Sequence, residues 1–382
     1  MPNHPRTRRQ KKASRSQIEY SVQRLWKAIT VSPRDLKSIK PAAPSSSPAT
    51  SLDVIGAAFT TPIERCHFLT NISLYKACIM PMVTAATSLR RALENPDSFI
   101  VAPGVYDGLS ARVALSAGFD ALYMTGAGTA ASVHGQADLG ICTLNDMRAN
   151  AEMISNISPS TPVIADADTG YGGPIMVART TEQYSRSGVA AFHIEDQVQT
   201  KRCGHLAGKI LVDTDTYVTR IRAAVQARQR IGSDIVVIAR TDSLQTHGYE
   251  ESVARLRAAR DAGADVGFLE GITSREMARQ VIQDLAGWPL LLNMVEHGAT
   301  PSISAAEAKE MGFRIIIFPF AALGPAVAAM REAMEKLKRD GIPGLDKEMT
   351  PQMLFRVCGL DESMKVDAQA GGAAFDGGVD LK

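Results

Sequence analysis

The sequence predicts an α/β fold, a (β/α)8 barrel of the TIM type, from three observations. Short, continuously apolar runs alternate with longer amphipathic runs, which is typical of parallel strands that helices cover on both faces. The apolar run occurs eight times between residues 99 and 318, and eight strand–helix units in about 250 residues make a barrel of ordinary size. Nearly every apolar run ends in a polar or charged residue, where such barrels carry their chemistry. A doubly wound open sheet is the alternative.

The two kinds of run place the elements along the chain. Strands are expected at residues 99–102, 121–125, 163–166, 191–195, 235–240, 266–270, 290–293 and 314–318. Helices are expected at residues 88–93, 107–117, 143–156, 214–230, 249–262, 273–284, 304–310 and about 320–340. The catalytic barrel is therefore expected over residues 84–360. Residues 361–382 are rich in glycine, alanine and aspartate, which predicts a disordered tail.

Residues 1–83 are interpreted as a disordered basic extension and linker. Residues 1–40 contain many lysines and arginines and few acids, and residues 41–51 form a flexible linker rich in proline and serine. Three interpretations remain open: a mitochondrial presequence, a disordered basic arm, or a true start at Met80 or Met82. The protein is accordingly expected in the cytoplasm or the mitochondrial matrix.

Composition excludes several classes of function. The 382-residue chain has a net charge of +2, which favours neither a nucleic acid nor a membrane surface as partner. No apolar run reaches the roughly 18 residues of a membrane-spanning helix. The five cysteines are scattered and lack a CxxC motif, which indicates a reducing compartment. The expected partner is therefore a small molecule.

Carboxylates follow four of the predicted strands. Asp166 and Asp168 follow the third strand, Glu195 the fourth, Asp242 the fifth and Glu270 the sixth. Charges at the mouth of a packed barrel are costly to bury unless they are paired or bind a metal. Their convergence favours a hard divalent cation, with Mg²⁺ as the first choice. A structural ion pair with the arginine before Asp242 is the alternative for one of the strands.

Two motifs imitate known binding loops. Residues 166–170 resemble the start of an EF-hand loop, but Tyr171 and Val177 stand where that loop needs glycine and glutamate. Residues 126–131 match a loose dinucleotide-binding fingerprint, but no clean helix is expected there, and residues 134–140 read as a loop. These glycines are better explained as giving backbone N–H groups access to a substrate carboxylate.

The run Lys201-Arg202-Cys203-Gly204-His205 combines two cations, a thiol and an imidazole. A thiol beside cations is expected to ionise more easily than a free one, which is typical of reactive cysteines. Taken alone, the run fits a solvated basic turn with an incidental cysteine equally well. The carboxylates at the neighbouring strand ends favour the reactive interpretation.

Together these motifs resemble the isocitrate lyase/phosphoenolpyruvate mutase superfamily over about residues 84–340. The matching stretches are residues 137–140, 166–172, 194–197, 201–205, 239–242 and Asn293. The resemblance implies a barrel whose last helix is exchanged with a neighbouring subunit, usually in a homotetramer. It also implies Mg²⁺, with Mn²⁺ as the alternative, near Asp166, Asp168 and Glu195, with Asp138 close by.

The resemblance also implies roles for individual residues. Residues 201–205 are similar to the mobile loop of the carbon–carbon lyase branch, whose cysteine, here Cys203, protonates a carbanionic intermediate. Lys201 and His205 would tune that thiol. Tyr123 is a candidate general base, with an aspartate or a metal-bound water as the alternative. The implied substrate-binding residues are Thr125, Gly126, Ala127, Gly204, Arg240, Glu270 and Asn293.

The implied reaction is the cleavage of a small 2-hydroxy or 2-oxo dicarboxylate, similar to dimethylmalate or oxaloacetate, by retro-aldol or retro-Claisen chemistry. Residues 267–271 depart from the pattern of enzymes acting on the tricarboxylate 2-methylisocitrate, which have proline before the glutamate and alanine after it. Cleavage of 2-methylisocitrate to pyruvate and succinate is the first alternative. Carboxyphosphonoenolpyruvate phosphonomutase-like chemistry is the second, and a barrel that only binds is the third.

Overall fold

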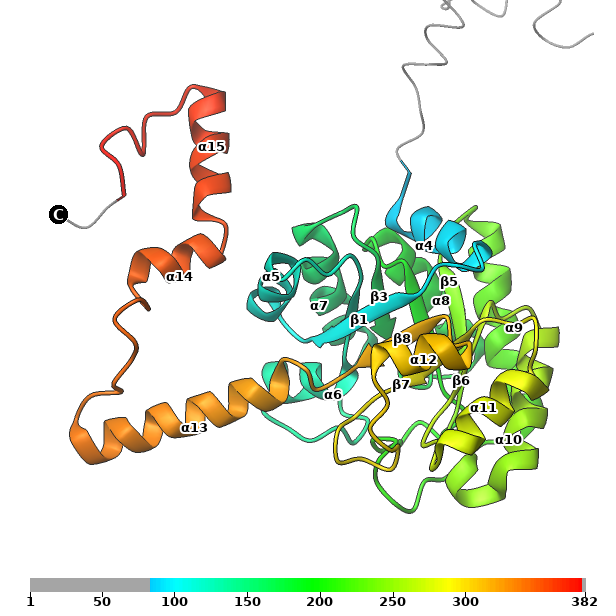
Figure 1. The fold of residues 1–382 in the computed structure, drawn as a ribbon. Helices are drawn as coiled ribbons and strands as arrows, with labels where there is room; N and C mark the ends of the chain where they lie inside the picture. Colours follow the sequence, from blue (N-terminus) through cyan, green and yellow to red (C-terminus); the bar gives the residue numbers. More distant parts are fainter. Residues whose placement is uncertain (1–82, 380–382) are drawn as a thin grey trace, which may run out of the picture. The chain divides into compact units, whose positions relative to one another are not determined.

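The structure, a computed structural model, describes residues 83–379 (Figure 1). Eight parallel strands follow one another in chain order and close into a barrel, in which β1 pairs with β8. The predicted (β/α)8 barrel is therefore confirmed. The expectations for residues 1–82 lie outside the described residues.

All eight predicted strands are present. They are β1 Ile100–Val105, β2 Leu122–Met124, β3 Val163–Asp166, β4 Ala191–Ile194, β5 Val236–Thr241, β6 Val266–Leu269, β7 Leu290–Asn293 and β8 Ile315–Phe318. Only β1 departs from its predicted bounds by more than one residue, because it continues through Pro103 and Gly104 to Val105. A Cβ on Gly104 would lie 2.2 Å from the Pro319 carbonyl oxygen, so this close approach requires glycine.

Helices follow the strands and cover the outside of the barrel (Figure 1). They are α4 Ala85–Glu94, α5 Gly108–Ser116, α6 Gly126–Thr129, α7 Leu144–Ile157, α8 Pro174–Arg186, α9 Thr214–Arg230, α10 Leu244–Asp261, α11 Arg275–Asp284, α12 Ala305–Met311, α13 Leu323–Asp340, α14 Pro351–Val357 and α15 Leu360–Ala370. Side-chain caps begin several of them, and α7 starts with a capping box between Thr143 and Asp146. α8, absent from the predicted helices, starts with Pro174, which is tolerated in a first turn.

The segment after β2 corrects one expectation. No clean helix was expected there, yet residues 126–129 form α6 and residues 130–134 continue it as a π-helix. The Thr125 hydroxyl accepts a hydrogen bond from the Gly128 N–H and so begins the helix. The sequence pattern missed this turn because glycine is a poor helix former and the helix is short.

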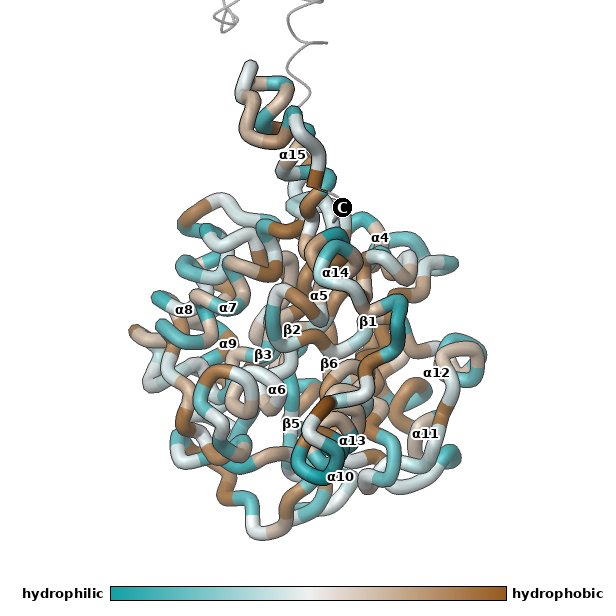
Figure 2. The backbone as a smooth tube through the Cα atoms, turned by 90° about the vertical axis from the view of Figure 1, so that its left-hand side faces the viewer, coloured by the Kyte–Doolittle hydropathy of each residue, from teal (hydrophilic) through white to brown (hydrophobic). Residues whose placement is uncertain are grey.

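The core has one cluster inside the barrel and further clusters between strands and helices. The inner cluster contains Tyr123, Ile164, Ile238 and Phe268. In the outer layer, Phe192 of β4 packs edge-on against a tyrosine of α8, with 5.8 Å between the ring centroids. Figure 2 shows hydrophobic segments gathered along the strands and hydrophilic ones on the surrounding helices. This burial holds the strand ends in fixed positions.

The C-terminal helices α13 to α15 differ from the helices around the barrel. α13 extends away from the barrel and has no buried residue (Figure 1). Residues 361–370 belong to α15, where a disordered tail was expected. The glycines that suggested disorder are concentrated after Ala370, whereas the segment before them contains no glycine or proline. Arg112 of α5 forms an ion pair of 3.1 Å with Glu362 of α15.

No helix within residues 83–379 has both the length and the apolar character that crossing a membrane requires.

Candidate active site

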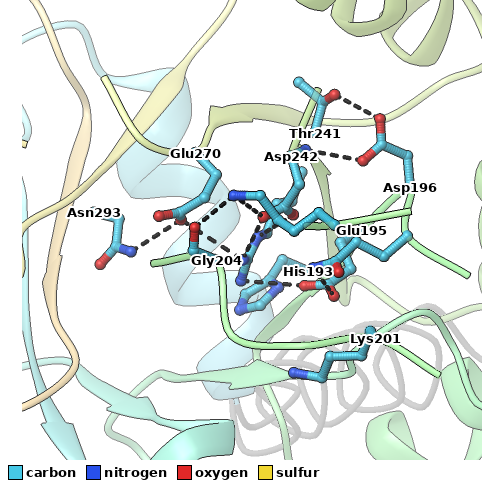
Figure 3. Close-up of polar contacts among 12 residues, drawn as sticks. His193, Glu195, Asp196, Lys201, Gly204, Thr241, Asp242, Glu270 and Asn293 are labelled. Carbon is cyan, nitrogen blue, oxygen red and sulfur yellow. Dashed lines mark hydrogen bonds and ion pairs between the residues drawn. The ribbon is translucent and has the colours of Figure 1, made fainter. Parts of the chain in front are cut away.

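The carboxyl ends of strands β3 to β7 bring the predicted polar residues together (Figure 3). Each of these side chains lies at or just after the end of its strand, as the fold requires. The buried residues that meet here are Asp166, Asp168, Glu195, Asp196, Arg240, Asp242, Glu270 and Asn293. Five strands therefore contribute to one charged centre at the mouth of the barrel.

Lys201 ties two of the predicted carboxylates together. Its Nζ atom lies 2.7 Å from Asp138 Oδ1 and 2.5 Å from Asp168 Oδ1. Burial, with the nearby carboxylates of Asp166 and Asp138, raises the pKa of Asp168 to about 6 despite the lowering effect of Lys201. Asp166 Oδ1 accepts the Asp168 backbone N–H at 2.8 Å. This side of the site holds more negative charge than its one lysine balances.

The carboxylates fit a divalent cation by their chemistry. Asp168 Oδ1 and Glu195 Oε2 are buried and face Lys201 Nζ at 2.5 Å and Arg240 Nη1 at 3.2 Å, respectively, and burial raises the pKa of Glu195 well above its usual value. Asp168 has a φ of 46°, a strained conformation that is enriched at functional sites. Within residues 83–379, no three His, Cys, Asp or Glu side chains form a ready metal-binding group. Mg²⁺ does not need such a cage, because it is commonly held by one or two carboxylates and several waters.

Arg240 occupies the opposite side of the site. Its Nε and Nη2 atoms donate to the two oxygens of Asp242 at 2.9 and 3.0 Å. Its Nη1 atom lies 3.2 Å from Glu195 Oε2. The guanidinium also lies over the Phe268 ring, with 5.2 Å between Arg240 Cζ and the ring centroid. Burial alone would raise the pKa of Asp242, but Arg240 and then Lys209 hold it below its ordinary value. Asp242 thus fixes one edge of the guanidinium and leaves the other edge facing Glu195.

Asp196 supports this arrangement from behind. Its carboxylate accepts hydrogen bonds from the Thr241 hydroxyl at 2.6 Å and from the Asp242 backbone N–H at 2.9 Å (Figure 3). Arg255 of α10 donates to Asp196 at 3.2 Å. These contacts fix the end of β5, and with it the backbone that carries Arg240.

Glu270 and Asn293 meet beside Arg240. Asn293 Nδ2 donates to Glu270 Oε2 at 3.0 Å (Figure 3). Glu270 Oε1 and Asn293 Oδ1 have no hydrogen-bond partner among the described side chains and backbone groups. His205 Nε2 approaches Glu270 Oε1 to 3.7 Å. Three of the predicted residues therefore present unpaired polar atoms to one another.

The active-site loop, residues 197–211, closes over these groups. Gln197 and Leu211 form an antiparallel bridge at its base. The Cys203 N–H donates to the Asp138 carbonyl at 3.1 Å. A Cβ on Gly204 would lie 2.5 Å from Arg240 Nη2, so only glycine can pack this closely on the arginine. The loop thus ties the Cys203 backbone to Asp138 and packs the next residue, Gly204, on Arg240.

The expected activation of Cys203 by its neighbouring cations is wrong. Burial raises the pKa of the thiol above its ordinary value, and a hydrogen bond from the His205 backbone opposes this only in part. Lys201 instead points into the carboxylates, and Arg202 Nη1 donates to the Ala207 carbonyl at 3.1 Å. Cys203 is therefore a protonated thiol near neutral pH, which suits a proton donor better than a nucleophile.

Tyr123 lies at the inner edge of the site. Its hydroxyl is hydrogen-bonded to His193 Nε2 at 2.9 Å, and the two rings stack with 5.9 Å between centroids. Burial, followed by the charge of Asp166, raises the pKa of Tyr123 well above 10. An unionised phenol of this kind donates a hydrogen bond more readily than it accepts a proton.

The residues after β2 line the floor beneath the carboxylates. Thr125 is buried and caps α6. A Cβ on Gly126 would lie 2.3 Å from Asp166 Oδ2, so the glycine is required by the carboxylate rather than by a nucleotide. Ala127 follows it in the first turn of α6.

Of three further buried residues of the site, the sequence indicated Asp242 but not His193 or Lys209. For Asp242, the ion pair with the preceding arginine was the alternative expectation, and the structure shows it, with Arg240 on β5 and Asp242 just after the strand. His193 lies within the apolar run that forms β4, and its surroundings along the chain do not indicate a polar contact. Lys209 carried no signal, because nothing in its surroundings along the chain marks it as buried.

His193 makes a testable contribution to stability. Burial lowers its pKa to about 4, and Asp166 only partly opposes this. An unfolded histidine titrates near 6.5, so between pH 6.5 and 4 the unfolded chain binds a proton that the folded chain does not. The free energy of unfolding should therefore fall as the pH drops, by on the order of 3 kcal/mol for this group.

The variant His193→Gln should lose that dependence. Denaturant unfolding at pH 7, 5.5 and 4.5 gives the free energy of unfolding of the wild type and of the variant. The two proteins are then compared by the slope of that free energy against pH. The exposed residue His247 provides the control, because His247→Gln should keep the wild-type slope. Equal slopes for wild type and His193→Gln would contradict the prediction.

The comparisons with known proteins agree with this site. A family model described as phosphoenolpyruvate phosphomutase matches residues 89–338. A 2,3-dimethylmalate lyase of Eubacterium barkeri is 38% identical over 279 residues, which cover 72% of this chain and 95% of the relative.

Two solved structures extend the comparison. The first is a crystal structure of a 2,3-dimethylmalate lyase, described as a PEP mutase/isocitrate lyase superfamily member. It is 98% identical to this chain, with a TM-score of 0.73, and the match covers 76% of this chain and 100% of the chain in that structure. The second is a structure of an oxaloacetate acetylhydrolase in complex with the inhibitor 3,3-difluorooxalacetate. It is 61% identical to this chain, with a TM-score of 0.75, and the match covers 76% of this chain and 98% of the chain in that structure.

Proposed function

The chain belongs to the phosphoenolpyruvate mutase/isocitrate lyase superfamily, in its carbon–carbon lyase branch, and from this premise we propose that it cleaves 2,3-dimethylmalate or a similarly small 2-hydroxy or 2-oxo dicarboxylate. The observation that carries the proposal is the active-site loop. It hydrogen-bonds the Cys203 N–H to the Asp138 carbonyl and packs the next residue, Gly204, directly on Arg240. This arrangement suits a reaction in which one end of a dianion is held while a carbanion at the other end is protonated.

The proposed reaction is a retro-aldol cleavage. A base removes the proton of the 2-hydroxyl group, and the oxygen forms a carbonyl as the C2–C3 bond breaks. The electron pair of that bond moves to C3 and spreads into the adjacent carboxylate as an enediolate. Protonation at C3 then gives pyruvate and propionate from 2,3-dimethylmalate. An oxo-acid such as oxaloacetate would need one water added at C2 before the same bond breaks.

Divalent-metal dependence is general in this superfamily, and we propose Mg²⁺, with Mn²⁺ as the alternative, for this chain. Asp166, Asp168 and Glu195 would hold it, with Asp138 nearby, because these carboxylates outnumber the cations that pair with them, Lys201 and Arg240. When bound, the cation supplies Lewis-acid stabilisation of negative charge on the substrate oxygen. The chain's own part is to hold the carboxylates of Asp166, Asp168 and Glu195 buried at the ends of β3 and β4.

Arg240 is proposed to bind a substrate carboxylate through the guanidinium edge that Asp242 does not occupy and that faces Glu195. A bidentate contact of this kind is one that lysine supplies poorly. The N–H groups of Gly126 and Ala127 and the hydroxyl of Thr125 would donate to a carboxylate from the floor of the site. Glu270, Asn293 and Gly204 would complete the pocket on the loop side.

Cys203 is proposed as the general acid that protonates C3. The raised pKa of its thiol keeps the proton available near neutral pH. His205 and Lys201 would keep the loop over the site, and closure would exclude water from the carbanion. Because burial holds Tyr123 in its neutral form, a carboxylate of the Asp166–Asp168 pair is a better base, and Tyr123 would donate a hydrogen bond.

A direct test is to incubate the protein and Mg²⁺ with 2,3-dimethylmalate, oxaloacetate and 2-methylisocitrate in separate reactions, and to identify the products by NMR. Pyruvate and propionate, or oxalate and acetate, would support the proposal. Pyruvate and succinate alone would replace it with the tricarboxylate reaction. No cleavage of any of the three would overturn it.

We also propose that α13 is exchanged with a second copy in a homotetramer. Val327, Met330, Met334 and Leu337 repeat along one side of α13 and stay exposed. Exposed apolar stripes of this kind mark interaction surfaces. Met330→Glu combined with Met334→Glu should dissociate the assembly, which analytical ultracentrifugation would measure. An unchanged sedimentation coefficient, or a wild-type protein that is monomeric, would contradict the proposal.

A further inference from the structure

Lys209 is a buried lysine that the reaction above does not use. Its side chain is 2% exposed, although it belongs to the active-site loop. The Nζ atom donates to the Gly204 carbonyl at 2.5 Å and lies 3.5 Å from Asp242 Oδ1. A buried ammonium group is retained only where specific partners compensate its loss of water. These two partners therefore define what Lys209 does.

The first partner belongs to the loop segment that carries the thiol. Gly204 directly follows Cys203, and its α-carbon packs on Arg240 and Glu270, where a Cβ would come within 2.5 and 2.7 Å of their side chains. Fixing the Gly204 carbonyl therefore fixes both the position of Cys203 and the contact of the loop with the arginine.

The second partner lies on the barrel wall. Asp242 is fully buried and holds two nitrogens of Arg240. Its backbone N–H is itself fixed by Asp196. The Asp242 carboxylate is therefore a rigid anchor, and Lys209 joins that anchor to the loop.

The loop is also held at its base and on its opposite side. At the base, the Val198 N–H donates to the Ile210 carbonyl at 2.9 Å. Opposite Arg240, Lys201 pairs with Asp138 and Asp168. The Cys203 N–H donates to the Asp138 carbonyl at 3.1 Å, and none of these contacts involves the Gly204 carbonyl. Lys209 supplies a contact that does.

We propose that Lys209 is a positioning residue, which anchors the Cys203–Gly204 segment to Asp242 and so holds the thiol at the distance that protonation of the carbanion requires. This inference rests on the proposed function. Lys209 acts through Gly204 and does not touch the substrate. It is needed when the loop is closed over the substrate, so its loss should lower kcat rather than weaken substrate binding.

The kinetic test uses Lys209→Met, which keeps the length of the side chain and removes its charge. With 2,3-dimethylmalate and Mg²⁺, kcat should fall by about 10–100-fold with KM changed less than about threefold, since small misplacements of reacting groups have effects of this size. Lys209→Arg should restore part of the rate. Lys309→Met, at an exposed position on α12, is the matched control and should keep wild-type kinetics.

A double-mutant cycle identifies the anchor. Lys209→Met and Asp242→Asn should be strongly non-additive, because each removes one side of the same contact. Effects on kcat that simply add would overturn Asp242 as the anchor.

Limited proteolysis tests the same contact without turnover. Trypsin needs a locally unfolded segment on both sides of the bond that it cuts, and Lys201 and Gly204, which flank the Arg202–Cys203 pair, are buried, so we expect this bond to be cut faster when the active-site loop opens. In Lys209→Met that cut should be about tenfold faster than in the wild type, as expected for a locally opened segment, while Lys309→Met should match the wild type. Mass spectrometry resolves this cut from those elsewhere.

The two assays separate the possible failures. A wild type that cleaves none of the acids would defeat the proposed function, and the proteolysis rates would still decide whether Lys209 holds the loop. An active wild type with unchanged kcat and unchanged proteolysis in Lys209→Met would overturn the inference about Lys209 alone.

Discussion

Replacement of Cys203 by serine is expected to lower kcat and kcat/KM together by about 10²–10⁴-fold, the usual contribution of a positioned general acid. Serine has nearly the same shape, so the chain should fold and bind substrate normally. Its hydroxyl releases a proton far less readily than a thiol does, so the enediolate would have to be protonated by solvent water, which is slower. Steady-state kinetics with 2,3-dimethylmalate and saturating Mg²⁺ would measure the loss.

Cys358→Ser provides a matched control, because Cys358 is exposed and lies far along the chain from the loop. It should keep wild-type kinetics. The competing explanation makes Cys203 a bystander in a basic loop that merely attracts an anion. In that case Lys201→Ala would raise KM in a salt-dependent way, and a Cys203→Ser variant within about threefold of wild type would end the assignment.

Asp168→Ala is expected to remove both turnover and the response to metal, with a loss in kcat on the order of 10³-fold, because several kcal/mol of charge stabilisation would be lost. Asp168 is one of the buried carboxylates proposed to hold the cation, so the site that remains in the variant should bind a cation weakly. Isothermal titration with Mg²⁺ would measure that affinity independently of catalysis.

Chelation should give the same result in the wild-type protein. Activity should be lost in EDTA and return when Mg²⁺ or Mn²⁺ is added. Asp261→Ala, which changes an exposed carboxylate at the end of α10, should behave as the wild type in both experiments. Full activity of the wild type in chelator would contradict the metal assignment.

The barrel could be predicted from sequence because its strands are continuously apolar and end in polar residues. Asp166, Glu195 and Arg240 each close such a run, and parallel strands bring their carboxyl ends to one edge. This is why the charged centre was predicted from spacing, whereas the identity of the reaction depended on the resemblance and on the loop residues 201–205.

The pKa of Cys203 and the contact of Lys209 could not be predicted, because they depend on long-range packing that the local sequence pattern does not encode. The pKa of Cys203 was expected to fall, but the loop buries the thiol and directs Lys201 towards Asp138 and Asp168. Lys209 looked like any surface lysine until the loop brought it to Asp242. α6 was missed because a single threonine cap initiates a turn that helix propensity disfavours.

The central claim is that the chain breaks a carbon–carbon bond and that its own thiol protonates the carbanion. Cleavage of 2,3-dimethylmalate in D₂O tests this most directly, with the released propionate examined by NMR as a chiral ester. Because the Cys203 thiol exchanges with solvent and delivers its deuteron from one side, we predict propionate with one deuterium at C2 in a single configuration, and a loss of that selectivity in Cys203→Ser. Propionate labelled equally in both configurations by the wild type, or no propionate at all, would contradict the claim.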